Sequence, residues 1–132
     1  MIAKGKNFLY KKMVLRQLYF SKELSSAELS KQIKKSIPVC NKILEGLISD
    51  GFVAESGFGP SSGGRRPLVY SLIPDVMYIV SVAMDQFITR IVMMDMQNNY
   101  IVDIDEFDLP LGNNPSALEI LAERIKKIIQ RS

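Results

Sequence analysis

Two short segments of the sequence combine basic, amide and glycine residues in a way suited to binding a polyanion. The first segment, 34–42, reads KKSIPVCNK, and the second, 63–66, reads GGRR. Lysine and arginine neutralise phosphates, arginine enters narrow minor grooves, and an asparagine amide pairs with a base edge. Glycine lets the backbone approach a ligand closely. The candidate DNA-contacting residues are Lys34, Lys35, Ser36, Ile37, Pro38, Val39, Asn41, Lys42, Gly63, Gly64, Arg65 and Arg66.

The sequence lacks the residues for common catalytic and metal-binding chemistries. It has no histidine and one cysteine, Cys40. This composition excludes Ser-His-Asp catalysis, imidazole bases and zinc cages built from imidazole or thiolate. No carboxylates cluster in a recognisable ligand loop. We therefore expect that the protein is not an enzyme and that it binds neither a metal ion nor a cofactor. The single cysteine, and the lack of a secretory signal or a long apolar run, predict a cytoplasmic protein that does not enter a membrane.

Charge is distributed unevenly along the chain. Residues 1–66 hold twelve basic and five acidic residues, a net charge of +7, whereas residues 67–132 hold five basic and nine acidic residues, a net charge of −4. Lysine-rich helix faces are often merely solvated, so charge alone leaves the question open. The asymmetry is nevertheless typical of a polyanion-binding half joined to a half with another task.

The elements that position the candidate residues follow from periodicity and capping signals. Apolar residues at helical spacing predict a helix over about residues 7–20. Ser25 and Glu28 match the S-x-x-E capping box, which opens a second helix ending near residue 34. Ser36 is a good N-cap for a third helix, and Pro38 suits its first turn. Asp50-Gly51 ends that helix. Inward-facing side chains are expected at Leu29, Ile33, Cys40, Ile43, Leu44, Leu47 and Ile48.

After the third helix the pattern predicts two strands, Phe52–Glu55 and Leu68–Leu72, joined by the glycine-rich loop 56–67. Three helices followed by a strand, a basic loop and a strand are the layout of a winged helix-turn-helix. Ile73-Pro74-Asp75 interrupts the chain. It predicts a DNA-binding domain over residues 1–73 and a second domain over residues 74–132.

The second domain reads as three strands and an amphipathic helix. The strands are predicted at Tyr78–Met84, Thr89–Met96 and Tyr100–Phe107, with connections short enough for antiparallel hairpins. The helix is predicted at Ser116–Gln130. Its apolar residues are Leu118, Leu121, Ile125 and Ile128. The expected fold class is therefore α+β, a winged helix-turn-helix followed by a small three-stranded antiparallel sheet with a C-terminal helix. Such a sheet has an open edge and an uncovered face, so we expect the second domain either to pair with a second copy or to be fragile.

The stretch beginning at Leu24, including LSSAELSKQIKKSIPVCNKILEGLISDGFVAE and SSGGRRPLVYSL, resembles the N-terminal domain of ROK-family repressors. That resemblance implies a MarR-like winged helix joined to a sugar-kinase-like domain of the actin-like, ribonuclease-H-like fold. The segment 75–98 is similar to the opening hairpin of that second domain. By this similarity, residues 37–42 would read bases, and Arg65 and Arg66 would contact DNA from the wing.

The resemblance also shows where the chain departs from the kinases of the family. Those kinases carry an Asp-x-Gly phosphate loop after the first strand, and the corresponding residues here are Ala83-Met84-Asp85. Aspartate in place of glycine would repel phosphate, which argues against ATP binding. The family's zinc-binding cysteines, sugar-contacting residues and catalytic aspartate would lie beyond Ser132. A sugar effector is therefore expected only if a longer parent chain exists.

The sequence thus predicts a sequence-specific regulator of transcription, and the resemblance to ROK-family repressors implies a repressor of sugar-utilisation genes. It would bind a palindromic operator in double-stranded DNA as a homodimer. The alternative is a winged helix that mediates protein–protein contact without reading bases. An apolar or acidic exposed face on the third helix would favour that alternative. A sugar kinase is excluded by the missing residues and by the chain length.

Overall fold

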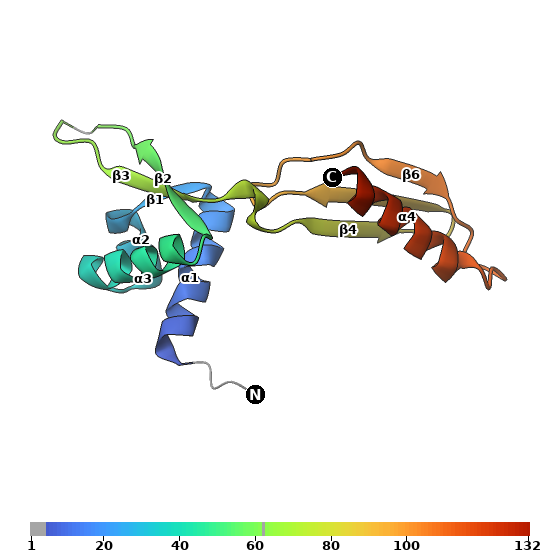
Figure 1. Ribbon diagram of the computed structural model, residues 1–132, viewed down its shortest axis with the longest axis horizontal. Helices are drawn as coiled ribbons and strands as arrows, with labels where there is room; N and C mark the ends of the chain where they lie inside the picture. Colours follow the sequence, from blue (N-terminus) through green and yellow to red (C-terminus); the bar gives the residue numbers. More distant parts are fainter. Residues whose placement is uncertain (1–4, 62) are drawn as a thin grey trace. The chain divides into compact units, whose positions relative to one another are not determined.

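The computed structural model describes residues 5–61 and 63–132. These residues form four α-helices and two three-stranded antiparallel sheets, as Figure 1 shows. Contacts divide the chain into two compact units, Met1–Val76 and Met77–Ser132. The expected mixture of helices and antiparallel sheets is confirmed. Within the described ranges, no helix combines the length and apolarity that crossing a bilayer requires.

The first unit contains three helices, α1 (Lys6–Ser21), α2 (Ser26–Ile33) and α3 (Ile37–Ser49). All three were predicted, with ends that differ by at most two residues. Their inward faces form an apolar core because leucine and valine recur at helical spacing. The side chains in this core with at most 1% exposure are Val14, Leu18, Leu29, Cys40, Leu44 and Leu47. One predicted core residue is wrong, because Ile48 is 38% exposed near the end of α3.

Local capping explains where these helices begin and end. The Ser25 hydroxyl accepts a hydrogen bond from the Glu28 amide at 3.2 Å, and the Glu28 carboxylate accepts one from the Ser25 amide at 2.7 Å. This reciprocal pair is the predicted capping box. Ser36 accepts from the Val39 amide at the start of α3. Gly51 follows the helix with a φ of +82°, which glycine adopts without steric cost.

The helices are followed by the hairpin of β2 (Val53–Phe58) and β3 (Leu68–Leu72). The sheet also contains β1 (Glu23–Ser25), which the sequence analysis did not predict and which pairs antiparallel with β3. The strand order is therefore β1–β3–β2. The prediction that the first hairpin strand ends at Glu55 is wrong. Gly57, with a φ of +115°, lies at a register shift that lets pairing continue to Phe58.

The second unit contains β4 (Ile79–Met84), β5 (Ile88–Met94), β6 (Asp105–Asp108) and α4 (Ala117–Arg131), and α4 runs along the sheet in Figure 1. The short 3₁₀ turn Pro74–Val76 precedes it in the chain. Ile91, Met93 and Ile128 are buried at the centre. Partly buried residues packed on them are Val80, Val82, Ile101, Val102, Phe107, Leu121 and Ile125. This core accounts for three of the four apolar residues predicted on α4. Leu118 does not contribute, because it is 76% exposed.

The predicted strand Tyr100–Phe107 is shorter in the structure. Tyr100 forms an isolated bridge with Met94, and the Ile101 amide donates to the Met93 carbonyl. Regular pairing resumes only at Asp105, which lies opposite Ile91. Between Tyr100 and Asp105 the chain has two more residues than the pairing of Tyr100 with Met94 would require. Part of this segment therefore does not pair with β5. Alternating apolar residues therefore predict one continuous strand here, although the register of pairing shifts within the segment.

Candidate nucleic-acid interface

A three-residue turn determines how α3 emerges from α2. Lys34 ends α2 in the left-handed conformation, with φ 56° and ψ 46°, and its amide donates to the Ser30 carbonyl. The Lys35 amide donates to the same carbonyl at 3.2 Å, and the Ser30 hydroxyl donates to the Lys35 carbonyl. These bonds satisfy backbone groups that the end of a helix leaves unpaired. Hydrogen bonds to Ser30 therefore fix the backbone of this turn against the end of α2.

The first two turns of α3 expose one side and bury the other. Ile37 is 45% exposed, and Ser36, Pro38, Asn41 and Lys42 are also exposed. Val39 is half-buried, whereas Cys40 is fully buried. Four of the candidate residues on α3, Ile37, Pro38, Asn41 and Lys42, therefore lie along its exposed side, whereas Val39 is only partly exposed.

Cys40 belongs to the core of the first unit. Burial raises the pKa of the Cys40 thiol, so the thiolate is disfavoured. Cys40 is therefore a core residue, as predicted.

Asn41 is held by a residue that the sequence analysis missed. The Ser26 hydroxyl, at the first residue of α2, donates a hydrogen bond to Asn41 Oδ1 at 2.5 Å. The two residues are 15 positions apart, and no local pattern connects them. The only trace in the sequence is the serine doublet at positions 25 and 26, of which the capping box uses one member.

Most basic residues of the interface are unpaired in the described part of the chain. Neither Lys34 nor Lys42 lies in an ion pair there. Lys35 lies over the Tyr10 ring, with its ammonium 4.7 Å from the ring centroid, an arrangement that attracts a cation to the aromatic face.

The loop between β2 and β3 carries the two arginines on an exposed surface. Gly63 has a φ of +99°, and the Ser61 hydroxyl donates to the Gly64 carbonyl at 2.9 Å. The base of the loop is closed by a bond from the Gly59 amide to the Pro67 carbonyl. Arg65 and Arg66 are exposed and form no ion pair with any described residue. In the view of Figure 1, this loop and the start of α3 both lie toward the left side of the first unit.

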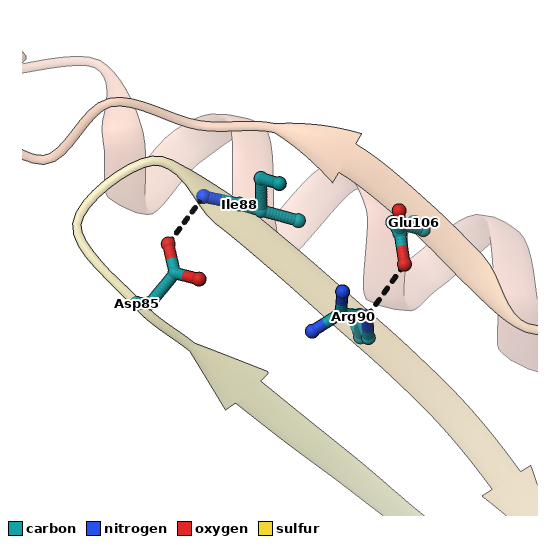
Figure 2. Close-up of polar contacts among 4 residues, drawn as sticks. All are labelled: Asp85, Ile88, Arg90 and Glu106. Atoms are coloured by element: carbon teal, nitrogen blue, oxygen red, sulfur yellow. Dashed lines mark hydrogen bonds and ion pairs between the residues drawn. The ribbon is translucent and has the colours of Figure 1, made fainter.

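In the second unit, the turn after β4 is closed by its own carboxylate. Asp85 accepts hydrogen bonds from the amides of Phe87 and Ile88, each at 2.7 Å, and Figure 2 shows the bond to Ile88. The bonds from Ile88 and Phe87 lower the pKa of Asp85. A phosphate would need such amides as donors, and here a carboxylate already occupies them. Among the described residues, no group of three or more cysteine or acidic side chains is placed to hold a metal ion.

Two curated proteins are similar in sequence, while no protein-family model matches the chain. Over 123 residues, the chain is 24% identical to the xylose repressor of Caldicellulosiruptor bescii, covering 92% of this chain and 31% of that protein. Over 72 residues it is 31% identical to a putative xylose repressor of Caldicellulosiruptor sp. strain Rt8B.4, covering 54% of this chain and 18% of that protein. The chain therefore spans less than a third of the length of either relative.

A solved structure shares the fold. It is that of a ROK-family transcriptional regulator, a homologue of the E. coli MLC protein, and it matches with a TM-score of 0.58 and 15% sequence identity. The match covers 91% of this chain and 31% of that chain. The relatives and the structural neighbour are named as regulators. The chain is thus similar in sequence to two proteins named as xylose repressors, and it shares its fold with a protein named as a ROK-family transcriptional regulator.

Proposed function

We propose that the first unit is a winged helix-turn-helix that binds double-stranded DNA. In this proposal α3 enters the major groove with its N-terminal end first, and the β2–β3 loop contacts the neighbouring backbone or minor groove. The observation that carries the proposal is the outward side of α3. Its first two turns expose amide, lysine and apolar side chains directly after a tight turn. The repressor relatives support the same function.

Each candidate residue has a distinct role in this proposal. Asn41 and Lys42 meet base edges, and Ile37 and Val39 contact thymine methyl groups. Lys34, Lys35 and Ser36 lie before the exposed turns of α3 and contact phosphates, which positions the helix without reading sequence. Pro38 holds the start of α3, and Gly63 and Gly64 let the loop approach DNA closely. Arg65 and Arg66 neutralise phosphates or enter the minor groove.

We further propose a homodimer on a palindromic operator, with half-sites about one helical turn apart. Because the curated relatives are named xylose repressors, genes of sugar utilisation are the proposed targets. A sugar would be the effector of a longer parent chain. A repressor acts on the chromosome, so the proposal locates the protein in the cytoplasm.

Selection of the full chain against a random pool of DNA duplexes tests the proposal. We expect enrichment of one motif that contains an inverted repeat, with binding that weakens steeply as salt rises. Asn41→Ala should lose preference at one base position more than it loses general affinity. Equal losses on selected and random duplexes would contradict base reading by Asn41. No enrichment and no salt-dependent duplex binding would favour the protein–protein interaction module instead.

A further inference from the structure

We propose that Ser26 is a positioning residue for Asn41, so that the first residue of α2 sets the base preference at the position that Asn41 contacts. This inference rests on the proposed DNA-binding function. It assigns a specificity role to a residue that makes no base contact itself.

The two adjacent serines at the start of α2 have different tasks. Ser25 is the N-cap, and its hydroxyl accepts from the Glu28 amide. The Ser26 hydroxyl is directed to α3, where it donates to Asn41 Oδ1 at 2.5 Å. Ser26 is half-buried and Asn41 is exposed, so the bond anchors the reading side chain at the edge of the helix pair.

This bond restricts what Asn41 presents to a ligand. An asparagine amide has an acceptor oxygen and two N–H donors, and a flip of the amide exchanges their places. While the Ser26 hydroxyl donates to Oδ1, the donor Nδ2 is the group of the amide left to bind a ligand. A donor matches an acceptor on the base edge, such as purine N7, guanine O6 or thymine O4. It does not match the N4 amino donor of cytosine. Asn41 should therefore discriminate against cytosine.

Tethering also removes a cost of binding. A free asparagine on an exposed helix face samples several rotamers and both amide orientations, and it loses this freedom when it contacts a base. The Ser26 hydroxyl restricts the amide before DNA arrives. Without that hydroxyl, the flipped amide presents Oδ1 outward and accepts from cytosine. Loss of Ser26 should thus broaden the preference at one position.

The experiment uses the full chain and four duplexes that differ only at the base pair whose preference is lost in Asn41→Ala. For Ser26→Ala, we expect the affinity ratio between the best base and cytosine to fall roughly three- to ten-fold at this position alone. Ser26→Thr, which keeps the hydroxyl, should restore the ratio. In an Asn41→Ala background, Ser26→Ala should have no further effect. Ser49→Ala, an exposed serine at the end of α3, is the matched control.

Three outcomes would overturn the proposal in different ways. An unchanged ratio in a Ser26→Ala protein with a wild-type circular dichroism spectrum would remove the positioning role. An equal loss of affinity for all four duplexes would assign Ser26 a general role in affinity and leave DNA binding by α3 intact. Failure of the wild-type chain to bind any duplex would end both this inference and the proposed function, and it is recognised before any variant is made.

Discussion

The two units use their charged side chains in different ways. On α3 and the β2–β3 loop of the first unit, the cations have no carboxylate partner among the described residues. In the second unit, oppositely charged groups contact each other. Arg90 pairs with Glu106 at 2.5 Å, and Arg124 pairs with Asp105 at 3.1 Å and lies over the Phe107 ring.

The carboxylates of the hairpin turns in the second unit are also satisfied internally. Asp85 accepts from two backbone amides, as described above. Asp95 is 7% exposed and accepts from the amides of Gln97 and Asn99 and from the Asn99 side chain. Both carboxylates therefore serve the fold of the second unit.

The difference shows which charges are available for a ligand. A lysine or arginine on a surface is normally just solvated, so an unpaired cation alone means little. In the first unit Lys11 pairs with Asp50, but the unpaired cations of α3 and the β2–β3 loop occur together with a net charge of +7 over residues 1–66 and with an outward helix side that follows a tight turn. The charges of the second unit stabilise its own turns and ladder. Four predictions probe this contrast, from the largest expected effect to the smallest.

Reversing the loop charges should have the largest effect. Arg65→Glu combined with Arg66→Glu should lower duplex affinity by about 100-fold or more near 0.1 M salt and reduce the salt slope by about two, because each neutralised phosphate contributes about 0.9 to that slope. The measurement is fluorescence anisotropy over a salt series. Lys127→Glu combined with Arg131→Glu in α4 changes the net charge equally and should alter affinity by less than about three-fold. Equal effects from both variants would mean that only net charge matters.

Removing the buried carboxylate of the second unit should destabilise that unit without changing the affinity of the chain for duplex DNA. Asp95→Ala leaves backbone and side-chain donors without their acceptor, so the free energy of unfolding should fall by about 1–3 kcal/mol. Urea denaturation monitored by circular dichroism measures the change. Asp103→Ala, an exposed residue before β6, is the control and should stay within about 0.5 kcal/mol of wild type. A loss of duplex affinity in Asp95→Ala would link the two units in a way that this contrast excludes.

Acid should weaken the same turns. For Asp95, burial raises the pKa, but hydrogen bonds from Asn99 and Gln97 outweigh it and the net pKa is lowered. The pKa of Asp85 is lowered by the amides of Ile88 and Phe87. A carboxyl whose pKa is lower in the folded state stabilises fully above its unfolded pKa near 4, and this contribution disappears as pH falls through the folded value.

We therefore expect the urea midpoint of the second unit to be constant between pH 7 and about pH 5 and to fall below about pH 4. Asp85→Asn combined with Asp95→Asn should make this acid-induced fall smaller. An equally steep fall in the double variant would show that other carboxyls are responsible.

Breaking the exposed pair on the sheet should have the smallest effect. Arg90 and Glu106 are 51% and 52% exposed, so water and salt screen their attraction. Glu106→Gln should change the free energy of unfolding by no more than about 0.5–1 kcal/mol, and high salt should remove the difference. Thermal denaturation at low and high salt provides the measurement. A larger loss would indicate that this pair sets the register of β5 and β6.

Much of the first unit follows from short-range patterns. The Ser25–Glu28 capping box, the Ser36 cap and the helix stop at Gly51 all depend on atoms within four residues of one another along the chain. Helical spacing also predicted most of the core. Such features can be read from a sequence because the interacting groups are neighbours in it.

Contacts between segments far apart in the sequence could not be predicted from short-range patterns. The pairing of β1 with β3, the extension of β2 past Gly57 and the shifted register of β6 depend on which strand lies alongside. Strand pairing leaves only a weak trace in each segment, since alternation does not reveal the partner or the register. The bond from Ser26 to Asn41 has the same origin, because it exists only once α2 and α3 have packed together.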